Sequence, residues 1–186
     1  MTAETPQEFT FQAEIKQLLH LLSHSLYQNR EIAIREIVSN ASDALDKFRH
    51  LTLVNSEIKN DEPLEIRVEP NEADRVLIIC DNGIGMTRDE LIKNLGTIAH
   101  SGSLEFLKSV RPTSTEGANN LSLIGQFGVG FYSAFMLAER VEVLSRSYSE
   151  DAGWKWESDG SGQFTVEPCD GLTRGTQVRL DRKSVV

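Results

Sequence analysis

The chain has 186 residues and a net charge of −9, and hydrophobic residues make up 39% of it. This length and composition suit one domain with a buried core, spanning residues 1–186, and the acidic balance argues against binding to nucleic-acid backbones. The N-terminus lacks an apolar signal core, and no apolar run is long enough to cross a bilayer. Two distant cysteines, Cys80 and Cys169, form neither a disulfide framework nor a metal knuckle. We therefore expect a protein that binds neither nucleic acid nor membranes and is located in the cytoplasm, with an organelle as the alternative.

The N-terminal part of the chain predicts one strand followed by two helices. Residues 8–14 alternate apolar and polar side chains, which is typical of a short strand, and apolar residues recur at helical spacing from Ile15 to Leu26. A second helix is expected from about Arg30 to Leu51. Its apolar positions, which should pack on the core, are Ile34, Ile37, Val38, Ala41, Leu45 and Phe48.

A β-hairpin is expected next. Residues 64–69 alternate strictly, residues 75–80 form a mostly apolar run, and the turn formers of 70–74 separate them, so the two strands should pair antiparallel. The sequence Asp81-Asn-Gly-Ile-Gly85 then ends the second strand. Thr87 and Glu90 have the spacing of a capping box, which predicts that a further helix begins there.

The second half of the chain opens with a long connection. Residues 99–122 hold Ser-Gly-Ser and a Pro-Thr-Ser-Thr run, and such loops are usually functional lids or disordered segments. The glycine-rich residues 125–130 should open a helix at 131–138, and strands are expected at 141–145, 162–167 and 176–180. We see no βαβ repeat. The predicted fold class is therefore α/β in the broad sense (α+β), with a mostly antiparallel sheet covered by helices on one face.

Four groups of residues could carry chemistry, and the first lies on the second predicted helix. Glu36 and Asn40 are four residues apart and share a helix face, with Asp43 close by. An amide oxygen suits a Mg²⁺ ion that already carries phosphate and water, and a carboxylate can orient a water for attack on a phosphate. A solvated helix face would give the same pattern.

The other three groups follow strands or open a helix. A carboxylate at Asp81, followed by two glycines, could accept a hydrogen bond from an exocyclic amine such as that of adenine, although Asn-Gly is also a common turn pair. Residues 125–130 spell GxxGxG ahead of a helix and could hold an anion, but they match neither the Walker nor the Rossmann motif. Thr176 begins the last strand, where its hydroxyl either reaches a ligand or merely favours the strand.

The order and spacing of these four groups resemble the four ATP-site boxes of the gyrase, heat-shock, histidine-kinase and mismatch-repair ATPase superfamily. The sequences of residues 27–47, 94–99 and 125–135 resemble motifs of the N-terminal ATP-binding domain of the heat shock protein 90 (ninety-kilodalton) chaperone family. The resemblance covers residues 9–180. It is greatest to bacterial members or an organellar relative. The resemblance implies a Bergerat-type fold, a two-layer sandwich of helices on a twisted, mostly antiparallel sheet.

The resemblance also implies roles for individual residues. Glu36 would be the catalytic general base for the attacking water, and Asn40 the Mg²⁺ ligand. Asp81 would bond the adenine amine, with Thr176 supporting through water. The residues expected to bind nucleotide are Asn40, Asp43, Asp81, Gly85, Met86, Asn94, Gly125, Gln126, Phe127, Gly128, Val129, Gly130, Phe131 and Thr176. Residues 99–123 would form the ATP lid.

The same resemblance implies a chaperone ATPase of the stress response. It would bind Mg-ATP or ADP, hydrolyse ATP slowly and drive the folding of client proteins. Two departures stand out: His100 replaces the Lys or Arg of many relatives near the lid hinge, and the chain stops at Val186. We expect the middle and C-terminal dimerisation domains to be absent, the isolated domain to be a monomer and the full-length protein a homodimer.

Other functions remain open at this point. A histidine kinase would need a phosphoacceptor-histidine domain, and none of the four histidines lies in an obvious dimer-helix box. A gyrase-type subunit would benefit from basic DNA-facing surfaces, which an acidic chain lacks. A nucleotide-binding module that does not hydrolyse ATP is disfavoured by the presence of Glu36.

Overall fold

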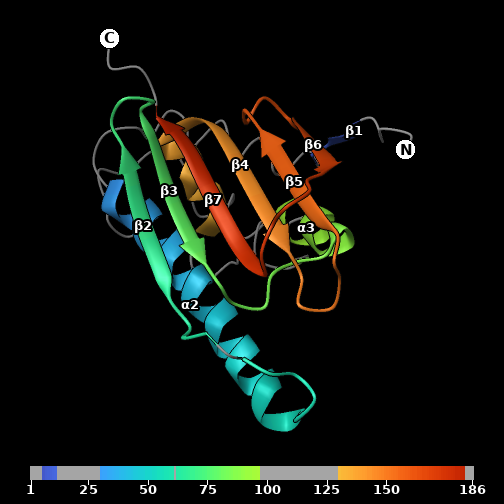
Figure 1. The fold of residues 1–186 in the computed structure, drawn as a ribbon. Helices are drawn as coiled ribbons and strands as arrows, with labels where there is room; N and C mark the ends of the chain where they lie inside the picture. Colours follow the sequence, from blue (N-terminus) through green and yellow to red (C-terminus); the bar gives the residue numbers. More distant parts are fainter. Residues whose placement is uncertain (1–5, 12–29, 61, 97–129, 183–186) are drawn as a thin grey trace, which may run out of the picture.

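A single curved sheet with helices on one face makes up the described part of the protein, which in this computed structural model comprises residues 6–11, 30–60, 62–96 and 130–182 (Figure 1). The strands are β1 (Gln7–Thr10), β2 (Ile66–Asn71), β3 (Val76–Asp81), β4 (Ala138–Arg146), β5 (Gly153–Ser158), β6 (Gln163–Pro168) and β7 (Gly175–Arg182). The helices are α2 (Arg30–Val54), α3 (Arg88–Gly96) and the 3₁₀ helix η1 (Gly130–Met136). Among these residues, no helix is both long and apolar enough to span a membrane.

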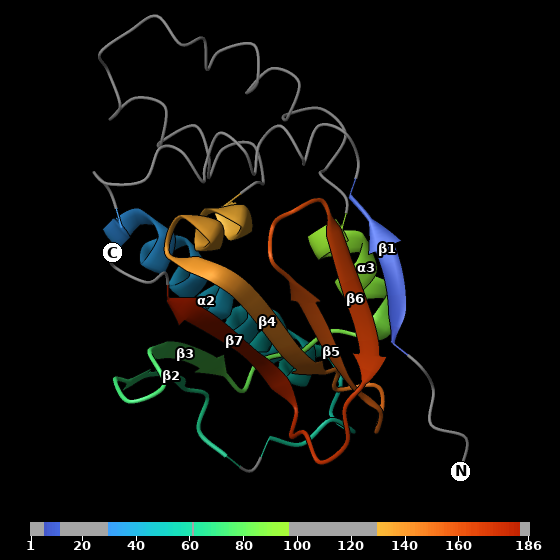
Figure 2. The ribbon, with the colours of Figure 1, turned by 90° about the horizontal axis from the view of Figure 1, so that it is seen from above.

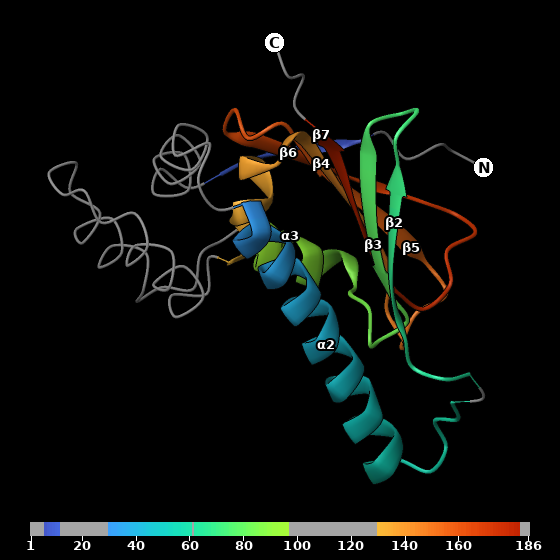
Figure 3. The same ribbon diagram turned by 90° about the vertical axis from the view of Figure 1, so that its left-hand side faces the viewer.

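The seven described strands follow the order β1-β6-β5-β4-β7-β3-β2, and every neighbouring pair is antiparallel. The helices α2, α3 and η1 lie together on one face of this sheet (Figures 2 and 3). The predicted fold class, a mostly antiparallel sheet with helices on one face, is therefore confirmed. The last strand, β7, lies between β3 and β4, so that the first hairpin joins the remainder of the sheet through the C-terminal strand.

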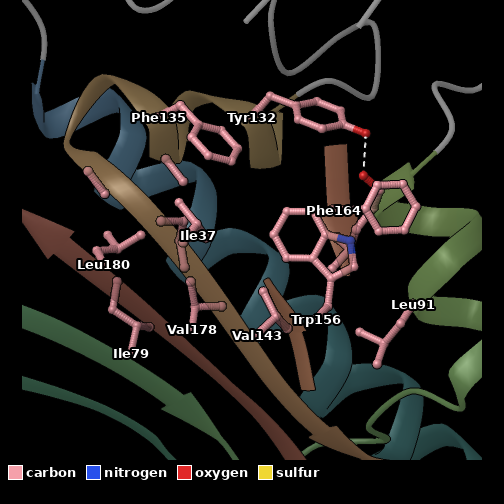
Figure 4. Close-up of a cluster of buried hydrophobic side chains, with 14 of the residues drawn as sticks. Ile37, Ile79, Leu91, Tyr132, Phe135, Val143, Trp156, Phe164, Val178 and Leu180 are labelled. Carbon is pink, nitrogen blue, oxygen red and sulfur yellow. Dashed lines mark hydrogen bonds between the residues drawn. The ribbon is translucent and has the colours of Figure 1, made fainter. Parts of the chain in front are cut away.

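The core fills the space between the helices and the sheet (Figure 4). Trp156 of β5 and Leu180 of β7 are fully buried, and Ile37 of α2 packs in the same cluster. The hydroxyl of Tyr132 in η1 donates to the Leu95 carbonyl at 2.7 Å, which ties η1 to the end of α3 (Figure 4). The predicted inward positions of the second helix are all buried or half-buried: Ile34, Ile37, Val38, Ala41, Leu45 and Phe48.

The local signals for turns and caps are also confirmed. β2 pairs with β3 as the predicted hairpin, from Ile66 opposite Asp81 to Asn71 opposite Val76. At the start of α3 the Thr87 amide donates to the Glu90 carboxylate at 2.8 Å, and the Glu90 amide donates to the Thr87 hydroxyl at 3.3 Å. This reciprocal pair is a capping box.

The structure differs from the sequence prediction in two elements. Strand β5 was not predicted, although Trp154 and Trp156 alternate with Lys155 and Glu157 at a strand period. The helix expected at 131–138 is the 3₁₀ helix η1, in which the Ser133 hydroxyl donates to the Gly130 carbonyl at 2.5 Å. The helix expected between Ile15 and Leu26, the segment 97–129 with His100, and the chain end at Val186 lie outside the described residues.

Candidate functional site

A cavity of about 500 Å³ lies where α2, α3 and η1 meet the inner face of strands β3, β4 and β7. Every predicted site residue that the structure describes lines this cavity. These residues are Glu36, Asn40, Asp43, Asp81, Gly85, Met86, Asn94, Gly130, Phe131 and Thr176. The other five predicted residues, Gly125, Gln126, Phe127, Gly128 and Val129, lie outside the described part of the chain.

Helix α2 supplies one wall. Glu36, Asn40, Asp43 and Lys47 recur every three or four residues, so they fall on one face of the helix, and all four line the cavity. Between them the apolar side chain of Ile37 is buried and anchors the helix on the sheet. Core packing therefore fixes the direction in which the polar face points. Lys47 was not predicted as a site residue.

Asp81 ends β3 and contributes its carboxylate to the inner part of the cavity. It stands directly opposite Thr176 of β7 in the sheet register, and both residues line the cavity. Burial raises the pKa of Asp81 from its ordinary value of 3.8 to about 6, although hydrogen bonds from the backbones of Gly83 and Thr176 act in the opposite direction. The Gly83 amide donates to the carboxylate at 2.9 Å. This is a half-buried acceptor with capacity for a further donor.

Two glycines leave room for close approaches at the cavity. Gly85 has a φ of 66°, and a Cβ there would lie 1.9 Å from the carbonyl oxygen of Arg146. At Gly130, where η1 begins, a Cβ would lie 2.3 Å from the Oε2 atom of Glu36. The glycines therefore let the loop after β3 press against β4 and let the Glu36 carboxylate lie against the backbone of η1.

The family follows from comparison with known proteins. A family model described as histidine kinase-, DNA gyrase B- and HSP90-like ATPase matches residues 27–163. The chain belongs to this ATPase family. The resemblance stated from the sequence is thereby confirmed, and the cavity is formed by residues within or just beyond the matched segment.

Chaperone proteins named HtpG are similar to this member of the ATPase family over nearly all of its length. The HtpG of Myxococcus xanthus is 53% identical across 98% of this chain, which corresponds to 28% of the relative. The HtpG of Shewanella amazonensis is 53% identical over 91% of this chain, which corresponds to 27% of that relative. The HtpG of Bordetella avium is 51% identical over 95% of this chain, which corresponds to 28% of that relative. The chain thus spans 28% or less of the length of these three relatives.

The cavity of this ATPase-family chain is acidic. Four carboxylates line it, and Lys47 is the single cation among the described lining residues; the carboxylates are those of Glu36, Asp43, Asp81 and Glu90. The described residues contain no group of three or more His, Cys, Asp or Glu side chains that could hold a metal by themselves. The hard amide oxygen of Asn40 fits a Mg²⁺ ion that brings phosphate and water as its other ligands.

Two further residues that shape this ATPase-family site, Ser145 and Arg174, were not predicted from the sequence. The Ser145 hydroxyl accepts a hydrogen bond from the Met86 amide at 2.9 Å. Arg174 donates to the Gly83 carbonyl at 2.8 Å, and the Arg174 guanidinium lies 3.6 Å from the centre of the Phe48 ring. Both therefore hold the loop that follows Asp81. The sequence pattern could have predicted that Ser145 is buried, because Ser145 continues the row of inward-facing residues on β4 that are otherwise apolar.

Proposed function

We propose that this chain is the ATP-binding domain of a molecular chaperone, which binds Mg-ATP and Mg-ADP in the cavity and hydrolyses ATP slowly. The observation that carries the proposal is the convergence of Asp81, Glu36 and Asn40 on one cavity from two elements, β3 and α2. Family membership and the similarity to HtpG chaperones support the same conclusion.

The adenine end of the nucleotide is proposed to bind at Asp81. The ionised carboxylate would accept a hydrogen bond from the exocyclic amine, with Thr176 contributing through water. Gly85 and Met86 line the same region and offer a flat, closely approached surface for the base, and Asp43 and Asn94 would form its polar rim.

The phosphate end is proposed to lie toward Glu36, Asn40 and Gly130. An acidic cavity repels a bare triphosphate, so the nucleotide should enter as its Mg²⁺ complex, with the Asn40 oxygen as a protein ligand of the ion. Glu36 would accept a proton from the water that attacks the γ-phosphate. Gly130 and Phe131, together with residues 125–129, would cradle the phosphates.

Turnover by this chain alone should be slow. Phosphoryl transfer depends strongly on a cation, often an arginine, that stabilises charge on the γ-phosphate, and no arginine is among the described lining residues. In the family that the chain resembles, the middle domain supplies this arginine. We propose that residues 99–123 close over ATP as a lid. We also propose that the full-length protein is a cytoplasmic homodimer, which couples ATP binding and hydrolysis to the folding of client proteins in the stress response.

The proposal is tested by comparing Glu36→Gln with Glu31→Gln. Both changes remove one carboxylate from α2, but Glu31 is exposed in the first turn and is not among the lining residues. ATP affinity, measured by isothermal titration calorimetry with Mg²⁺, should stay within a few-fold in both variants. Turnover should fall by about 10²–10⁴ in Glu36→Gln alone, since a positioned general base typically contributes that much. Equal turnover in the two variants would reject Glu36 as the base, and absence of ATP binding by the parent would reject the function.

A further inference from the structure

Three polar side chains stand in one row across adjacent strands at the inner end of the cavity. Asp81 of β3 is opposite Thr176 of β7, and Thr176 is opposite Ser145 of β4. Residues opposite each other in a register share a face of the sheet. Asp81 and Thr176 line the cavity, whereas Ser145 is only 1% exposed and is not among the lining residues.

The hydrogen bonds of Ser145 fix the direction of its proton. A serine hydroxyl has one proton and two acceptor lone pairs. Its oxygen lies 2.9 Å from the Gly175 carbonyl oxygen, which can only accept, so the Ser145 proton is used there. The Met86 amide donates to Ser145 at 2.9 Å and occupies one lone pair. The remaining contact, 2.9 Å to the Thr176 hydroxyl oxygen, must then carry the proton of Thr176.

This arrangement determines what Thr176 offers to a ligand. Its only proton is directed away from the cavity toward Ser145, so Thr176 presents lone pairs alone. Asp81 beside it is also an acceptor when ionised. The Asp81 and Thr176 side chains therefore both present acceptors and are complementary to a group rich in donors, such as an amine or a water that donates to both residues.

We propose that Ser145 is a positioning residue that makes Thr176 an acceptor and thereby selects a 6-amino purine over a 6-oxo purine. The inference rests on the proposed function, since it assumes that a purine nucleotide binds with its base at Asp81. A water that donates to both Asp81 and Thr176 offers only lone pairs to the base, so a 6-oxo group would meet acceptors alone and leave a hydrogen bond unmade. Without Ser145, the Thr176 hydroxyl is free to turn and donate to that water, which can then donate to the oxo group.

The experiment measures the ratio of the dissociation constants for ADP and inosine diphosphate by isothermal titration calorimetry at pH 8, with Mg²⁺. The parent should prefer ADP at least about tenfold, and Ser145→Ala should reduce that preference by about tenfold, the usual effect of one buried hydrogen bond made or lost. Ser145→Thr keeps the hydroxyl and should retain the parental ratio. Ser158→Ala is the matched control, because Ser158 is a buried strand serine that also donates to a carbonyl, Gln163, and accepts from an amide, Gly160.

The outcomes distinguish failure of the proposed nucleotide binding from failure of the proposed role of Ser145 in selectivity. A parent that binds neither nucleotide rejects the proposed function. A parent that binds ADP, with a Ser145→Ala variant that loses affinity for both nucleotides equally, overturns the selectivity role and leaves Ser145 as a support for the Met86 loop. An equal change of ratio in Ser158→Ala would overturn it as well. If Ser145→Ala does not fold, Ser145→Cys serves instead, because a thiol is a weak hydrogen-bonding group of similar shape; an unchanged ratio in that variant overturns the proposal.

Discussion

Replacing Asp81 with Asn should change how the stability of the ligand-free protein depends on pH. The pKa of Asp81 is about 6 in the folded protein, against an ordinary value of 3.8, because burial disfavours its charged form. A raised pKa means that the folded state holds the proton more tightly than the unfolded state. The stabilisation is therefore fully present below pH 3.8 and is lost as pH rises through 6.

The size of this effect follows from the two pKa values. At pH 5 the unfolded carboxyl is already mostly ionised, whereas the folded carboxyl is still mostly protonated because its pKa is about 6. The stabilisation at pH 5 therefore corresponds to about one unit, the difference between pH 5 and the folded pKa, and it is lost by pH 8. One unit corresponds to about 1.4 kcal/mol. For a domain of this size each kcal/mol moves the melting temperature by roughly 2–4 °C, so the contribution of Asp81 is roughly 3–6 °C.

Differential scanning calorimetry of the ligand-free proteins at pH 5, 6.5 and 8 measures this contribution. Asp81→Asn has no proton to lose, so the melting temperature of the parent should fall relative to that of the variant by roughly 3–6 °C across the range. The two proteins differ at one residue, so the contributions of all other groups cancel in the difference. Asp170→Asn, which removes an exposed carboxylate that does not line the cavity, should run parallel to the parent. Parallel curves for parent and Asp81→Asn would refute the argument that Asp81 is held in a desolvating site.

Three further predictions concern the glycines and the capping box. Gly85→Ala should lower the free energy of unfolding by at least about 2 kcal/mol, because a Cβ would meet backbone 1.9 Å away at a φ of 66°; urea unfolding measures this, and a change below about 0.5 kcal/mol would contradict the geometry. Gly130→Ala should change the free energy of unfolding by no more than about 1 kcal/mol, because the added Cβ meets the movable end of the Glu36 side chain. It should lower ATP turnover by displacing that carboxylate, and an unchanged turnover would contradict the position of Glu36 beside Gly130. Thr87→Ala should lower the melting temperature by roughly 2–4 °C, since loss of an N-cap costs about 1 kcal/mol; no change in thermal melting would show that the cap is not needed.

Local patterns carried most of what the sequence predicted about the fold. The apolar spacing of α2, the turn formers between β2 and β3, and the Thr87–Glu90 pair each act over a few residues, and each is confirmed. The sequence could also predict which polar residues would converge, because their order along the chain resembles that of a known ATPase family. Their roles in binding and catalysis remain predictions.

Features that depend on distant contacts could not be predicted in this way. The place of β7 between β3 and β4 joins segments about a hundred residues apart, and no local pattern encodes that pairing. Ser145 depends on the same register, because two of its partners lie on β7. Arg174 reaches Gly83 across 91 positions of sequence, so its support of the loop after Asp81 becomes visible only in the folded chain.

A crystal structure of this chain with Mg-ADP is the most direct test that its cavity binds an adenine nucleotide. We expect one nucleotide in the cavity lined by α2, β3 and β7, with the adenine amine within hydrogen-bonding distance of the Asp81 carboxylate and the phosphates toward Asn40 and Gly130. A nucleotide bound elsewhere, or one in the cavity with its base remote from Asp81, would contradict this expectation.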